Sequence, residues 1–338
     1  MQTRLIDART VERTADFGTI IPAIRTAFGA YAQDNVVMPP KSYIELPEYN
    51  GDFRAMPAYL DTGEWDAAGI KWVNVHPDNP DDHDLPTVLG LVIYSDPETA
   101  YPLAIIDGAT ITRLRTGAAA GVATDILAAP EARSLGLVGA GVQSYSQLEA
   151  IASVRPIETV VVADVDQAAV DRFTDHWGDR FEVRAGTPAA AAGCDILSTL
   201  TPVREPLIHR DAVEPGTHIN AIGADAPGKR ELSTDLLEAA TIIIDDYEQC
   251  THSGEINVPW SEGRLDDSDL YAELGDLVLG TVPLPDATSE ITVFDSTGLA
   301  IQDIATAHVI YEAVLDGDAS GDIGTGKPFD FFDVESDR

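Results

Sequence analysis

The sequence predicts an α/β fold built on two sheets, one parallel and doubly wound, the other mainly antiparallel. From Leu135 onward, short apolar runs alternate with helical segments, the pattern of a parallel sheet with helices on both faces. Before Gly108, strand-like segments follow one another through short turns, as in an antiparallel sheet. At 338 residues, 44% of them hydrophobic, the chain is long enough for two domains with sizeable cores.

The first region opens with a predicted helix. Within residues 10–33, apolar side chains from Phe17 to Tyr31 recur at helical spacing, so one face of this helix is expected to pack on a core. Two prolines before Lys41 then force an extended path. Strands are predicted at 41–46, 53–60, 69–77, 87–94 and 101–107, and the acidic, proline-bearing segment 78–84 is predicted to be a turn.

A long helix from Gly108 is predicted to connect the two regions, because apolar residues from Ile111 to Val122 recur every three or four residues. A last helix, 300–314, follows the last strand and is expected to return to the first region. Residues 329–338 are predicted to be a loose end. The strands predicted between the two helices are 135–138, 159–163, 181–183, 195–200, 218–222, 241–244 and 291–294.

The charge balance excludes two classes of partner. The chain carries 57 acidic and 21 basic residues, a net charge of −36, and such a field repels nucleic acid and anionic membranes. Acids are interspersed with apolar segments throughout, which indicates an acid-coated globular surface rather than an acidic tail. Such a surface is typical of adaptation to molar salt, where screening shortens to a few ångström, so we expect a halophilic protein.

The sequence contains no pattern for secretion, membrane insertion or metal binding. No window approaches about 18 consecutive apolar residues, and the N-terminus has no apolar signal region, so a cytoplasmic chain is predicted. The two cysteines, Cys194 and Cys250, support neither a disulfide framework nor a zinc site. The seven histidines are scattered without ligand spacing, and no metal is expected.

The predicted strand 135–138 ends in a glycine-rich turn that is typical of Rossmann-type dinucleotide binding. Gly139 provides a residue without Cβ for a tight turn, and Gly141 lets the backbone approach a pyrophosphate at the N-terminus of the next helix. Ser144 stands where a third glycine is usual and is small enough for close helix–strand packing. The alternative is a tight strand–helix turn without a ligand.

Asp164 ends the next predicted strand, about 20 residues after Gly141, where an acid holds the hydroxyls of an adenosine ribose. A carboxylate at this place repels a 2′-phosphate, and no arginine follows it closely. NAD is therefore favoured over NADP as the cofactor. The alternative is an acid that merely stabilises the turn at the end of a strand.

Two groups of basic residues are candidates for a site. Alternation in the strand 69–77 places Lys71 with Val73 and Val75 on one face, so Lys71 is either a buried cation with a partner or a lysine extending past an edge. Arg113 and Arg115 lie on the connecting helix. One of them is suited to grip a carboxylate in a bidentate pair, and the alternative is an arginine on the helix surface.

Two strand ends in the second region carry polar residues. The strand 218–222 is followed by glycine, Asp225 and Lys229, and 291–294 is followed by the polar segment 295–298. Because the carboxyl ends of parallel strands form the ligand crevice, Asp225 is a candidate acid or base, and the segment 295–298 is a candidate contact for the nicotinamide. For Asp225 the alternative is an ordinary turn acid.

Five motifs, in order and over nearly the whole chain, together resemble the ornithine cyclodeaminase/μ-crystallin family. That family includes archaeal-type alanine dehydrogenase, ornithine and lysine cyclodeaminases and ketimine reductases. The motifs are Gly69-Ile-Lys71-Trp-Val-Asn-Val-His-Pro-Asp-Asn79, Leu114-Arg115-Thr116-Gly117-Ala118, Gly139-Ala-Gly141-Val-Gln143-Ser144, Asn220-Ala-Ile-Gly-Ala-Asp225-Ala-Pro-Gly-Lys229 and Asp295-Ser-Thr-Gly298.

The resemblance implies NAD(P) as cofactor, a homodimer, and a small amino acid or 2-oxo acid as substrate. It also implies a discontinuous substrate-binding and dimerisation domain, residues 1–115 and 303–338, beside a Rossmann NAD-binding domain, residues 116–302. Lys71 and Asp225 match catalytic positions, and Lys41, Lys71 and Arg115 match positions that bind the carboxylate of the substrate. The residues that match cofactor positions are Thr116, Gly139, Gly141, Val142, Gln143, Asp164 and Ser296.

One departure from the family bears on the substrate. Where ornithine cyclodeaminase carries a glutamate before Met-Pro, this chain has Arg54-Ala-Met56-Pro57, so Arg54 is expected to favour a substrate without a second ammonium. The expected activity is NAD-dependent alanine dehydrogenase, which converts L-alanine, NAD and water to pyruvate, ammonia and NADH. The alternatives are an ornithine cyclodeaminase that recycles NAD, a related ketimine reductase, and a nucleotide-binding protein without turnover, as the μ-crystallin resemblance allows.

Overall fold

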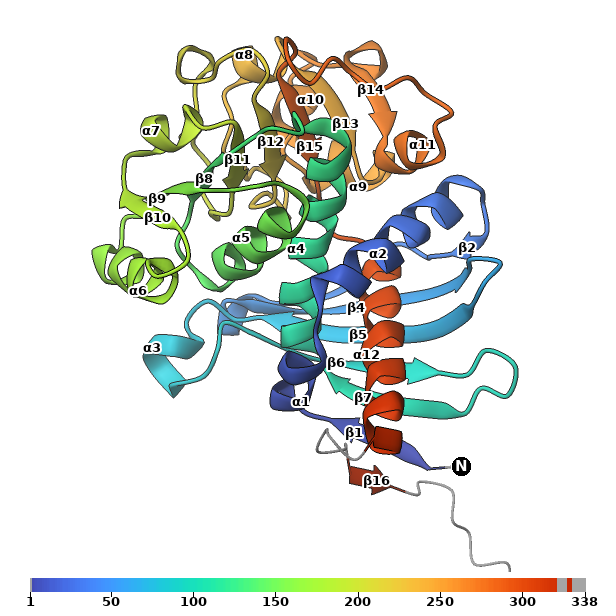
Figure 1. The fold of residues 1–338 in the computed structure, drawn as a ribbon. Helices are drawn as coiled ribbons and strands as arrows, with labels where there is room; N and C mark the ends of the chain where they lie inside the picture. Colours follow the sequence, from blue (N-terminus) through green and yellow to red (C-terminus); the bar gives the residue numbers. More distant parts are fainter. Residues whose placement is uncertain (1, 321–326, 330–338) are drawn as a thin grey trace, which may run out of the picture. The chain divides into compact units, whose positions relative to one another are not determined.

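The computed structural model describes residues 2–320 and 327–329, and its contacts divide the chain into two compact units (Figure 1). Unit 1 comprises residues 1–115 and 300–338, and unit 2 comprises residues 116–299. The sequence-based division placed the return of the chain at residue 303. The contacts place it at Ala300, where helix α12 (Ala300–Ser320) begins. Residues 330–338 of the predicted loose end lie outside the described residues.

Unit 1 is built on a mainly antiparallel sheet, with the strand order β16-β1-β7-β6-β5-β4-β2 and with β3 paired to β4. β1 and β7 run parallel, whereas the neighbouring pairs along β4, β5, β6 and β7 are antiparallel, as predicted. The strands are β1 (Thr3–Ile6), β2 (Val36–Val37), β3 (Ser42–Leu46), β4 (Gly51–Asp61), β5 (Asp66–Val75), β6 (Val88–Ser95), β7 (Pro102–Asp107) and β16 (Lys327–Phe329).

One face of this sheet is buried and carries Lys71. Lys71 and Val73 are 1% and 5% exposed, whereas Trp72 between them is 40% exposed, so the predicted alternation of β5 is confirmed. Met56 lies opposite Lys71 on β4, and Arg54 lies opposite Val73. Directly opposed residues share a face, so Arg54 is a diagonal neighbour of Lys71. Helices α12 and α2 (Phe17–Ala32) pack on β4, and α12 also packs on β5 and β6 (Figure 1).

The single helix predicted over 10–33 is wrong, because the structure has two helices, α1 (Ala8–Thr14) and α2. Asp16 is extended, and its side chain accepts the N–H of Gly18 at 2.9 Å, which starts a new helix. The predicted turn at 78–84 contains the short helix α3 (Asn79–His83), which has proline in its first turn and ends at Asp84 in a left-handed conformation, φ 54°. The long helix predicted from Gly108 is present as α4 (Gly108–Leu127).

Unit 2 contains an all-parallel sheet in the order β10-β9-β8-β11-β12-β15-β13-β14. The seven predicted strands are present, with ends within two residues of prediction, and β14 was missed because Leu-Tyr-Ala-Glu is no apolar run. The strands are β8 (Ser134–Val138), β9 (Thr159–Ala163), β10 (Glu182–Ala185), β11 (Ile196–Thr199), β12 (His218–Ala221), β13 (Thr241–Ile244), β14 (Leu270–Glu273) and β15 (Thr292–Asp295).

Apolar cores cover both faces of this sheet. Leu137 belongs to one buried cluster and Val138 to the other, and Ile196 and Leu197 divide in the same way, so the predicted doubly wound fold is confirmed. None of the described helices has the length and apolar composition of a membrane span. The α-helices of unit 2 are α5 (Val142–Val154), α6 (Gln167–Trp177), α7 (Pro188–Ala192), α8 (Thr234–Leu237), α9 (Tyr247–Ser253), α10 (Asn257–Ser261) and α11 (Leu274–Leu279).

The strand order reverses at β8, which is flanked by β9 on one side and β11 on the other. In doubly wound sheets, ligands bind at the carboxyl ends of the strands at this reversal. The glycine-rich turn follows β8 directly. The fold therefore places the sequence-predicted dinucleotide motif at the usual place for a ligand.

Candidate functional site

The turn between β8 and α5 has the geometry that its glycines predict. Gly139 has φ 108°, which L side chains rarely adopt, and an added Cβ would lie 3.1 Å from Leu200 Cβ. Gly141 is the N-cap of α5, and an added Cβ would meet no atom within 4 Å. The backbone at Gly141 is therefore open at the start of α5, where the first N–H groups of a helix can bind an anion. Val142, 69% exposed, and the half-buried Gln143 begin the helix.

Ser144 replaces the third glycine of the motif without separating the helix from the sheet. Its side chain is fully buried, and its hydroxyl donates to Gly141 O at 2.7 Å. Thr116, at the start of unit 2, is also buried, and its carbonyl accepts a hydrogen bond from Gln147 Nε2 at 3.2 Å. α4 and α5 thus pack closely beneath the glycine turn.

Asp164 lies just after β9 and is hydrogen-bonded to the glycine turn. Its Oδ2 accepts the N–H of Ala140 at 2.6 Å, and its Oδ1 accepts the N–H of Asp166 at 2.9 Å. The side chain thus has the turn role that was the alternative interpretation. A carboxylate has about four lone-pair sites, so each oxygen retains capacity for a ribose hydroxyl. The two interpretations of Asp164 are compatible.

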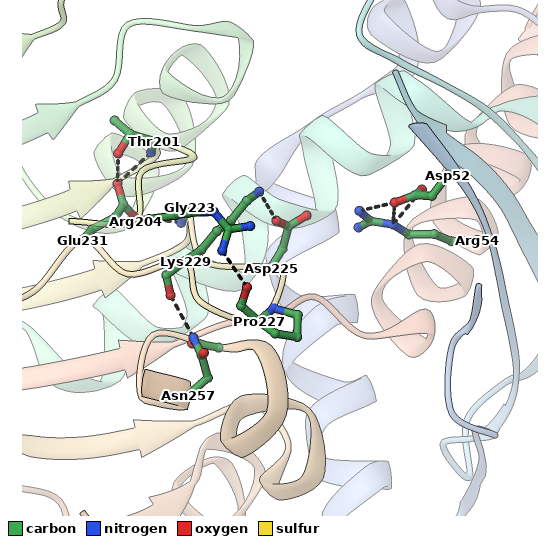
Figure 2. A network of polar contacts seen from close by, with 11 residues as sticks. Asp52, Arg54, Thr201, Arg204, Gly223, Asp225, Pro227, Lys229, Glu231 and Asn257 are labelled. Atoms are coloured by element: carbon green, nitrogen blue, oxygen red, sulfur yellow. Dashed lines mark hydrogen bonds and ion pairs between the residues drawn. The ribbon is translucent and has the colours of Figure 1, made fainter. Parts of the chain in front are cut away.

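Asp225 lies in the loop after β12 and is paired with Lys229. The Lys229 ammonium lies 2.6 Å from Asp225 Oδ1, and the side chains of Lys229 and Asp225 are 22% and 33% exposed (Figure 2). Asn257 fixes this loop, since its Oδ1 accepts Gly228 N–H at 2.8 Å and its Nδ2 donates to Lys229 O at 2.8 Å. Arg204 Nη1 donates to Pro227 O from the loop after β11. The loop holds Asp225 at a defined, accessible place.

A chain of three buried carboxyl groups connects the strand ends behind this loop; we call Asp295, Glu255 and Glu231 the carboxyl chain. Asp295 accepts the N–H groups of Glu255 and Ile256, at 2.8 and 3.1 Å. Glu255 Oε1 in turn accepts the N–H groups of Glu231 and Leu232, at 2.8 and 2.6 Å. Each acid therefore holds the backbone of the next one.

Glu231 ends the carboxyl chain at the loops that follow β11 and β12. Its Oε1 accepts from Thr201 N at 2.7 Å and from Thr201 Oγ1 at 2.6 Å, and its Oε2 accepts from Gly223 N at 3.0 Å (Figure 2). Gly223 lies two residues before Asp225. The carboxyl chain thus extends from the end of β15 to the segment that carries Asp225.

Burial raises the pKa of every member of the carboxyl chain. For Asp295 the pKa rises to about 7, because the side chain is fully buried and Asp245 lies nearby. Burial also raises the pKa of Glu231, and the pKa of Glu255 lies well above its usual value because of burial and the neighbouring Glu231. These carboxyl groups therefore retain protons at a pH where exposed acids have lost them.

Ser296 lies after β15 and is hydrogen-bonded within unit 2. Its hydroxyl donates to Asp245 Oδ2 at 3.0 Å, and Gly298 N–H donates to the same oxygen at 2.9 Å. Thr297 Oγ1 donates to Asp245 Oδ1 at 3.1 Å. Asp245 thus orders the polar segment predicted to approach the nicotinamide.

In unit 1, Lys71 is part of a buried charge cluster. Its ammonium lies 2.8 Å from Asp303 Oδ1, in α12, and donates to Thr112 Oγ1 at 3.2 Å. Arg115 Nε donates to the same Asp303 oxygen at 3.1 Å, and Arg115 Nη1 donates to Gln302 Oε1 at 2.9 Å. Lys71 is therefore a buried cation with partners, one of the two interpretations that the sequence left open.

Burial lowers the pKa of Lys71 to about 7, although Asp303 opposes this change. Arg115 and Lys41 lower the pKa further through charge repulsion, so the predicted carboxylate-binding residues Lys41, Lys71 and Arg115 act on one another electrostatically. Arg113, the other arginine of α4, lies 3.4 Å from the exposed Glu12 instead. Of the two arginines, Arg115 belongs to the cluster.

Arg54 lies on the same face of the sheet as Lys71 and forms an ion pair with Asp52. Its Nη2 lies 2.9 Å from Asp52 Oδ2, and its Nε donates to Asp52 Oδ1 at 3.1 Å (Figure 2). Its guanidinium carbon lies 5.4 Å from the centroid of the Tyr43 ring. With 14% of its side chain exposed, Arg54 is held in place and remains partly accessible.

Three of these acids, Asp303, Glu231 and Glu255, were not among the residues predicted from the sequence, whereas Asp295 belongs to the predicted polar segment 295–298. Asp303 follows Gln302 within an otherwise apolar run from Leu299 to Ala305, and that interruption is a signal for a buried polar pair. Glu231 and Glu255 stand among ordinary polar residues of a very acidic sequence. No local pattern distinguishes them, because their partners are backbone N–H groups that the fold brings from distant segments.

The chain is similar to several characterised proteins over nearly its whole length. The sequence profile described as the Ornithine cyclodeaminase/mu-crystallin family matches residues 1–318, which confirms the resemblance. An alanine dehydrogenase of Archaeoglobus fulgidus is 45% identical over 93% of this chain and 96% of its own length.

Two solved structures have the same fold. One, described as an archaeal alanine dehydrogenase dimer with bound NAD, has a TM-score of 0.91 and 43% identity, and the match covers 98% of this chain and 100% of that one. The other is the Δ1-pyrroline-2-carboxylate reductase of Thermococcus litoralis in complex with NADH and L-proline. It has a TM-score of 0.90 and 32% identity, over 96% of this chain and 99% of that one.

Because the carboxyl chain is protonated in the folded protein, we expect stability to fall as pH rises. Glu255→Gln should remove part of this dependence. Folded Glu255 keeps a proton that the unfolded chain loses near pH 4.3, so the free energy of unfolding falls as pH rises above that value. The amide of the variant does not titrate, and its carbonyl oxygen can still accept both N–H groups. Between pH 5 and 8, the free energy of unfolding of the variant should rise relative to that of the unmutated protein by up to about 1.4 kcal/mol per pH unit. Chemical denaturation measures both free energies. If the difference between the two free energies of unfolding does not change with pH, Glu255 is ionised in the folded protein and the prediction is wrong.

Proposed function

The chain belongs to the ornithine cyclodeaminase/mu-crystallin family, and on that premise we propose that it is an NAD-dependent alanine dehydrogenase. The reaction converts L-alanine, NAD and water to pyruvate, ammonium and NADH with release of a proton. Unit 2 provides the dinucleotide site and Asp225, and unit 1 provides the groups that hold the carboxylate of the substrate. The alanine dehydrogenase of Archaeoglobus fulgidus, 45% identical to this chain, supports the proposal.

The observation that carries the choice of substrate is the gathering of cations on one face of unit 1. In a chain with a net charge of −36, Lys41, Lys71, Arg54 and Arg115 lie on or near this face. A cationic site of this kind attracts the carboxylate of an amino acid and repels a second ammonium group. Alanine, whose side chain is uncharged and small, fits it, and ornithine brings a second positive charge.

The residues of unit 2 fit a dinucleotide. The open backbone at Gly141 and the start of α5 suit the pyrophosphate, and Asp164 suits the adenosine ribose. Val142 and Gln143, in the first turn of α5, border the pyrophosphate, and Thr116 and Ser296 belong to the proposed cofactor-binding residues. Bound NAD accepts a hydride from the Cα of the substrate.

The residues of this chain then have three tasks in the mechanism. Lys71 and Arg115 hold the carboxylate of alanine, which fixes the Cα–H bond in one direction. Once the amino group of alanine has lost a proton to solvent, loss of hydride leaves a protonated imine on the substrate, and Asp225 orients and deprotonates the water that attacks its carbon. Lys229, whose ammonium lies 2.6 Å from Asp225 Oδ1, holds this carboxylate in place for the step. Collapse of the resulting carbinolamine releases ammonia and pyruvate.

A second candidate is the reduction of a cyclic ketimine. The Thermococcus litoralis structure, 32% identical to this chain, is described as a Δ1-pyrroline-2-carboxylate reductase with NADH and L-proline. Such a substrate also combines a carboxylate with an imine carbon, so the same cations and the same hydride transfer would serve it. An ornithine cyclodeaminase is disfavoured by Arg54, although the same unit contains two other acids nearby in the sheet, Glu45 on β3 and Asp61 at the end of β4.

We also propose a cytoplasmic homodimer. The face of the unit 1 sheet opposite Lys71 exposes apolar side chains, with Trp72 at 40%, Leu91 at 50% and Ile93 at 39%, and Phe53 stacks on Trp72 with ring centroids 5.2 Å apart. A contiguous apolar face of this kind is usually covered by a partner. The solved archaeal alanine dehydrogenase is described as a dimer, which supports a second copy of the chain as that partner.

The surface charge supports adaptation to high salt. At a net charge of −36, the folded chain repels itself, and molar salt shortens the range of this repulsion to about 3 Å. The protein is therefore proposed to work in a concentrated salt solution.

The cofactor preference is predicted to depend on Asp164. NAD should be used more efficiently than NADP, and Asp164→Ser should narrow the ratio of the two kcat/KM values by about tenfold or more, because a carboxylate repels the 2′-phosphate. Asp166→Ser is the matched control, since it removes an equal charge two residues away and retains an N-cap for α6. Equal efficiency with both cofactors in the unmutated protein would contradict this role for Asp164.

The substrate proposal predicts that NADH accumulates when the protein is incubated with NAD and L-alanine, followed at the nicotinamide absorbance in molar KCl. L-Ornithine should give little ammonia, because its second ammonium meets the cations of unit 1. Asp225→Asn should abolish the reaction and leave NADH binding nearly intact. Release of proline and ammonia from ornithine without net change in NADH, with alanine inert, would refute the proposal in favour of a cyclodeaminase.

Dilution into a buffer of low ionic strength is predicted to unfold or inactivate the protein, because the repulsion among its acids is then no longer screened. The thermal midpoint should rise steadily with KCl concentration, measured by circular dichroism. Sucrose at the same osmolality is the control, since it stabilises by exclusion without screening charge. Full stability in dilute buffer would rule out the adaptation to salt.

A further inference from the structure

We propose that Asp303 is the positioning residue of the carboxylate-binding site: it keeps Lys71 protonated and holds the cationic groups of Lys71 and Arg115 for the substrate. This inference rests on the proposed function, because the site is a substrate site only if the substrate carries a carboxylate. It assigns to α12 a role in the chemistry beyond packing on the sheet.

A single oxygen of Asp303 contacts both cations. Asp303 Oδ1 lies 2.8 Å from Lys71 Nζ and 3.1 Å from Arg115 Nε, so one atom joins β5, α4 and α12. Within the described part of the chain, no hydrogen-bond partner lies at Asp303 Oδ2, although that atom is buried. The carboxylate is thus directed at the two cations, and its hydrogen-bonding capacity is only partly used.

Stability alone does not account for this cluster. Lys71 is 1% exposed and Asp303 is fully buried, and replacing a buried ion pair by apolar residues of similar size is often neutral or stabilising. The neighbours of Lys71 on β4 and β6, Met56 and Val92, are apolar, so an apolar residue at position 71 would have suitable surroundings. The cluster therefore points to a use for the charge itself.

The charges around Lys71 show why Asp303 is needed. From α4 the cation Arg115 faces Lys71, from the segment before β3 the cation Lys41 acts on it, and Arg54 lies diagonally across on β4 with its charge balanced by Asp52. Burial and the charges of Arg115 and Lys41 favour the neutral amine. Asp303 is the acid in the cluster that opposes them, and without it Lys71 would lose its proton, since an arginine does not.

A neutral amine at position 71 would bind a carboxylate far less well than an ammonium. The structure therefore links substrate affinity to pH through Asp303: kcat/KM should fall as pH rises through the pKa of Lys71. If Asp303 only joined α12 to the sheet, its replacement would change neither the titration of Lys71 nor the pH at which kcat/KM falls.

The test follows the lysines directly by NMR, because the chain has only four, Lys41, Lys71, Lys229 and Lys327. Protein labelled with carbon-13 at lysine Cε is titrated with NADH present, and the Lys71 signal is assigned from its loss in Lys71→Arg. In Asp303→Asn the midpoint of Lys71 should fall by about one pH unit or more. Asp225→Asn is the matched control, since it removes the carboxylate beside Lys229 and should move the Lys229 signal alone.

A second variant should change the titration midpoint of Lys71 in the opposite direction. Arg115→Gln removes a cation and leaves Asp303 to Lys71, so the midpoint of Lys71 should rise. An unchanged midpoint in folded Asp303→Asn would overturn the proposal. If that variant does not fold, Asp303→Glu decides, because it moves the carboxylate by one methylene: a lower midpoint of Lys71 supports the proposal and an unchanged midpoint overturns it.

Kinetics separate this inference from the proposed function. With L-alanine, the alkaline limb of kcat/KM should move to lower pH in Asp303→Asn by the same amount as the NMR midpoint, while the affinity for NADH is unchanged. If the unmutated protein does not turn over alanine, the proposed function fails, and the NMR midpoints still decide whether Asp303 controls Lys71.

Discussion

Unit 1 depends on the placement of three buried charges. Asp303 lies on α12, Lys71 on β5 and Arg115 on α4. The two cationic side chains lie 2.8 and 3.1 Å from Asp303 Oδ1, so these three elements must pack together. The alternation of β5 brings Lys71 to the buried face, and the return of the chain at Ala300 brings Asp303 to the same place. Unpaired, any of these charges would destabilise the fold by several kcal/mol. Folding and the proposed recognition of a carboxylate therefore depend on the same contact.

In unit 2, buried carboxyl groups bind backbone N–H groups instead of cations. The loops at the carboxyl ends of its strands have backbone N–H groups that no neighbouring strand can accept, and Asp295, Glu255 and Glu231 accept them. Burial raises the pKa of these acids, so they serve as partly protonated acceptors instead of full charges. The loop that carries Asp225 is held by the last of them. The backbone that leads to Asp225, a proposed site residue, is thus held by buried acids.

Much of this fold could be predicted from the sequence because its signals are local. The glycine turn needs φ near 108° at Gly139, and the buried strands are apolar runs. The break at Asp16 was missed because a cap changes little in the apolar spacing around it. Lys71, Asp225 and Asp295 could be proposed as site residues from their positions, and Asp303 interrupts an apolar run, whereas nothing local distinguishes Glu231 and Glu255. Their roles come from partners far away in the sequence, and in a chain with 57 acids no single acid stands out.

The central claim is that these groups serve the oxidation of alanine and, in reverse, the reductive amination of pyruvate. The most direct measurement is incubation of the protein with pyruvate, nitrogen-15 ammonium and NADH in molar KCl, with the products identified by mass spectrometry. The account predicts nitrogen-15 L-alanine in equal amount to the NADH consumed. Absence of labelled alanine, together with conversion of L-ornithine to proline without net change in NADH, would contradict it.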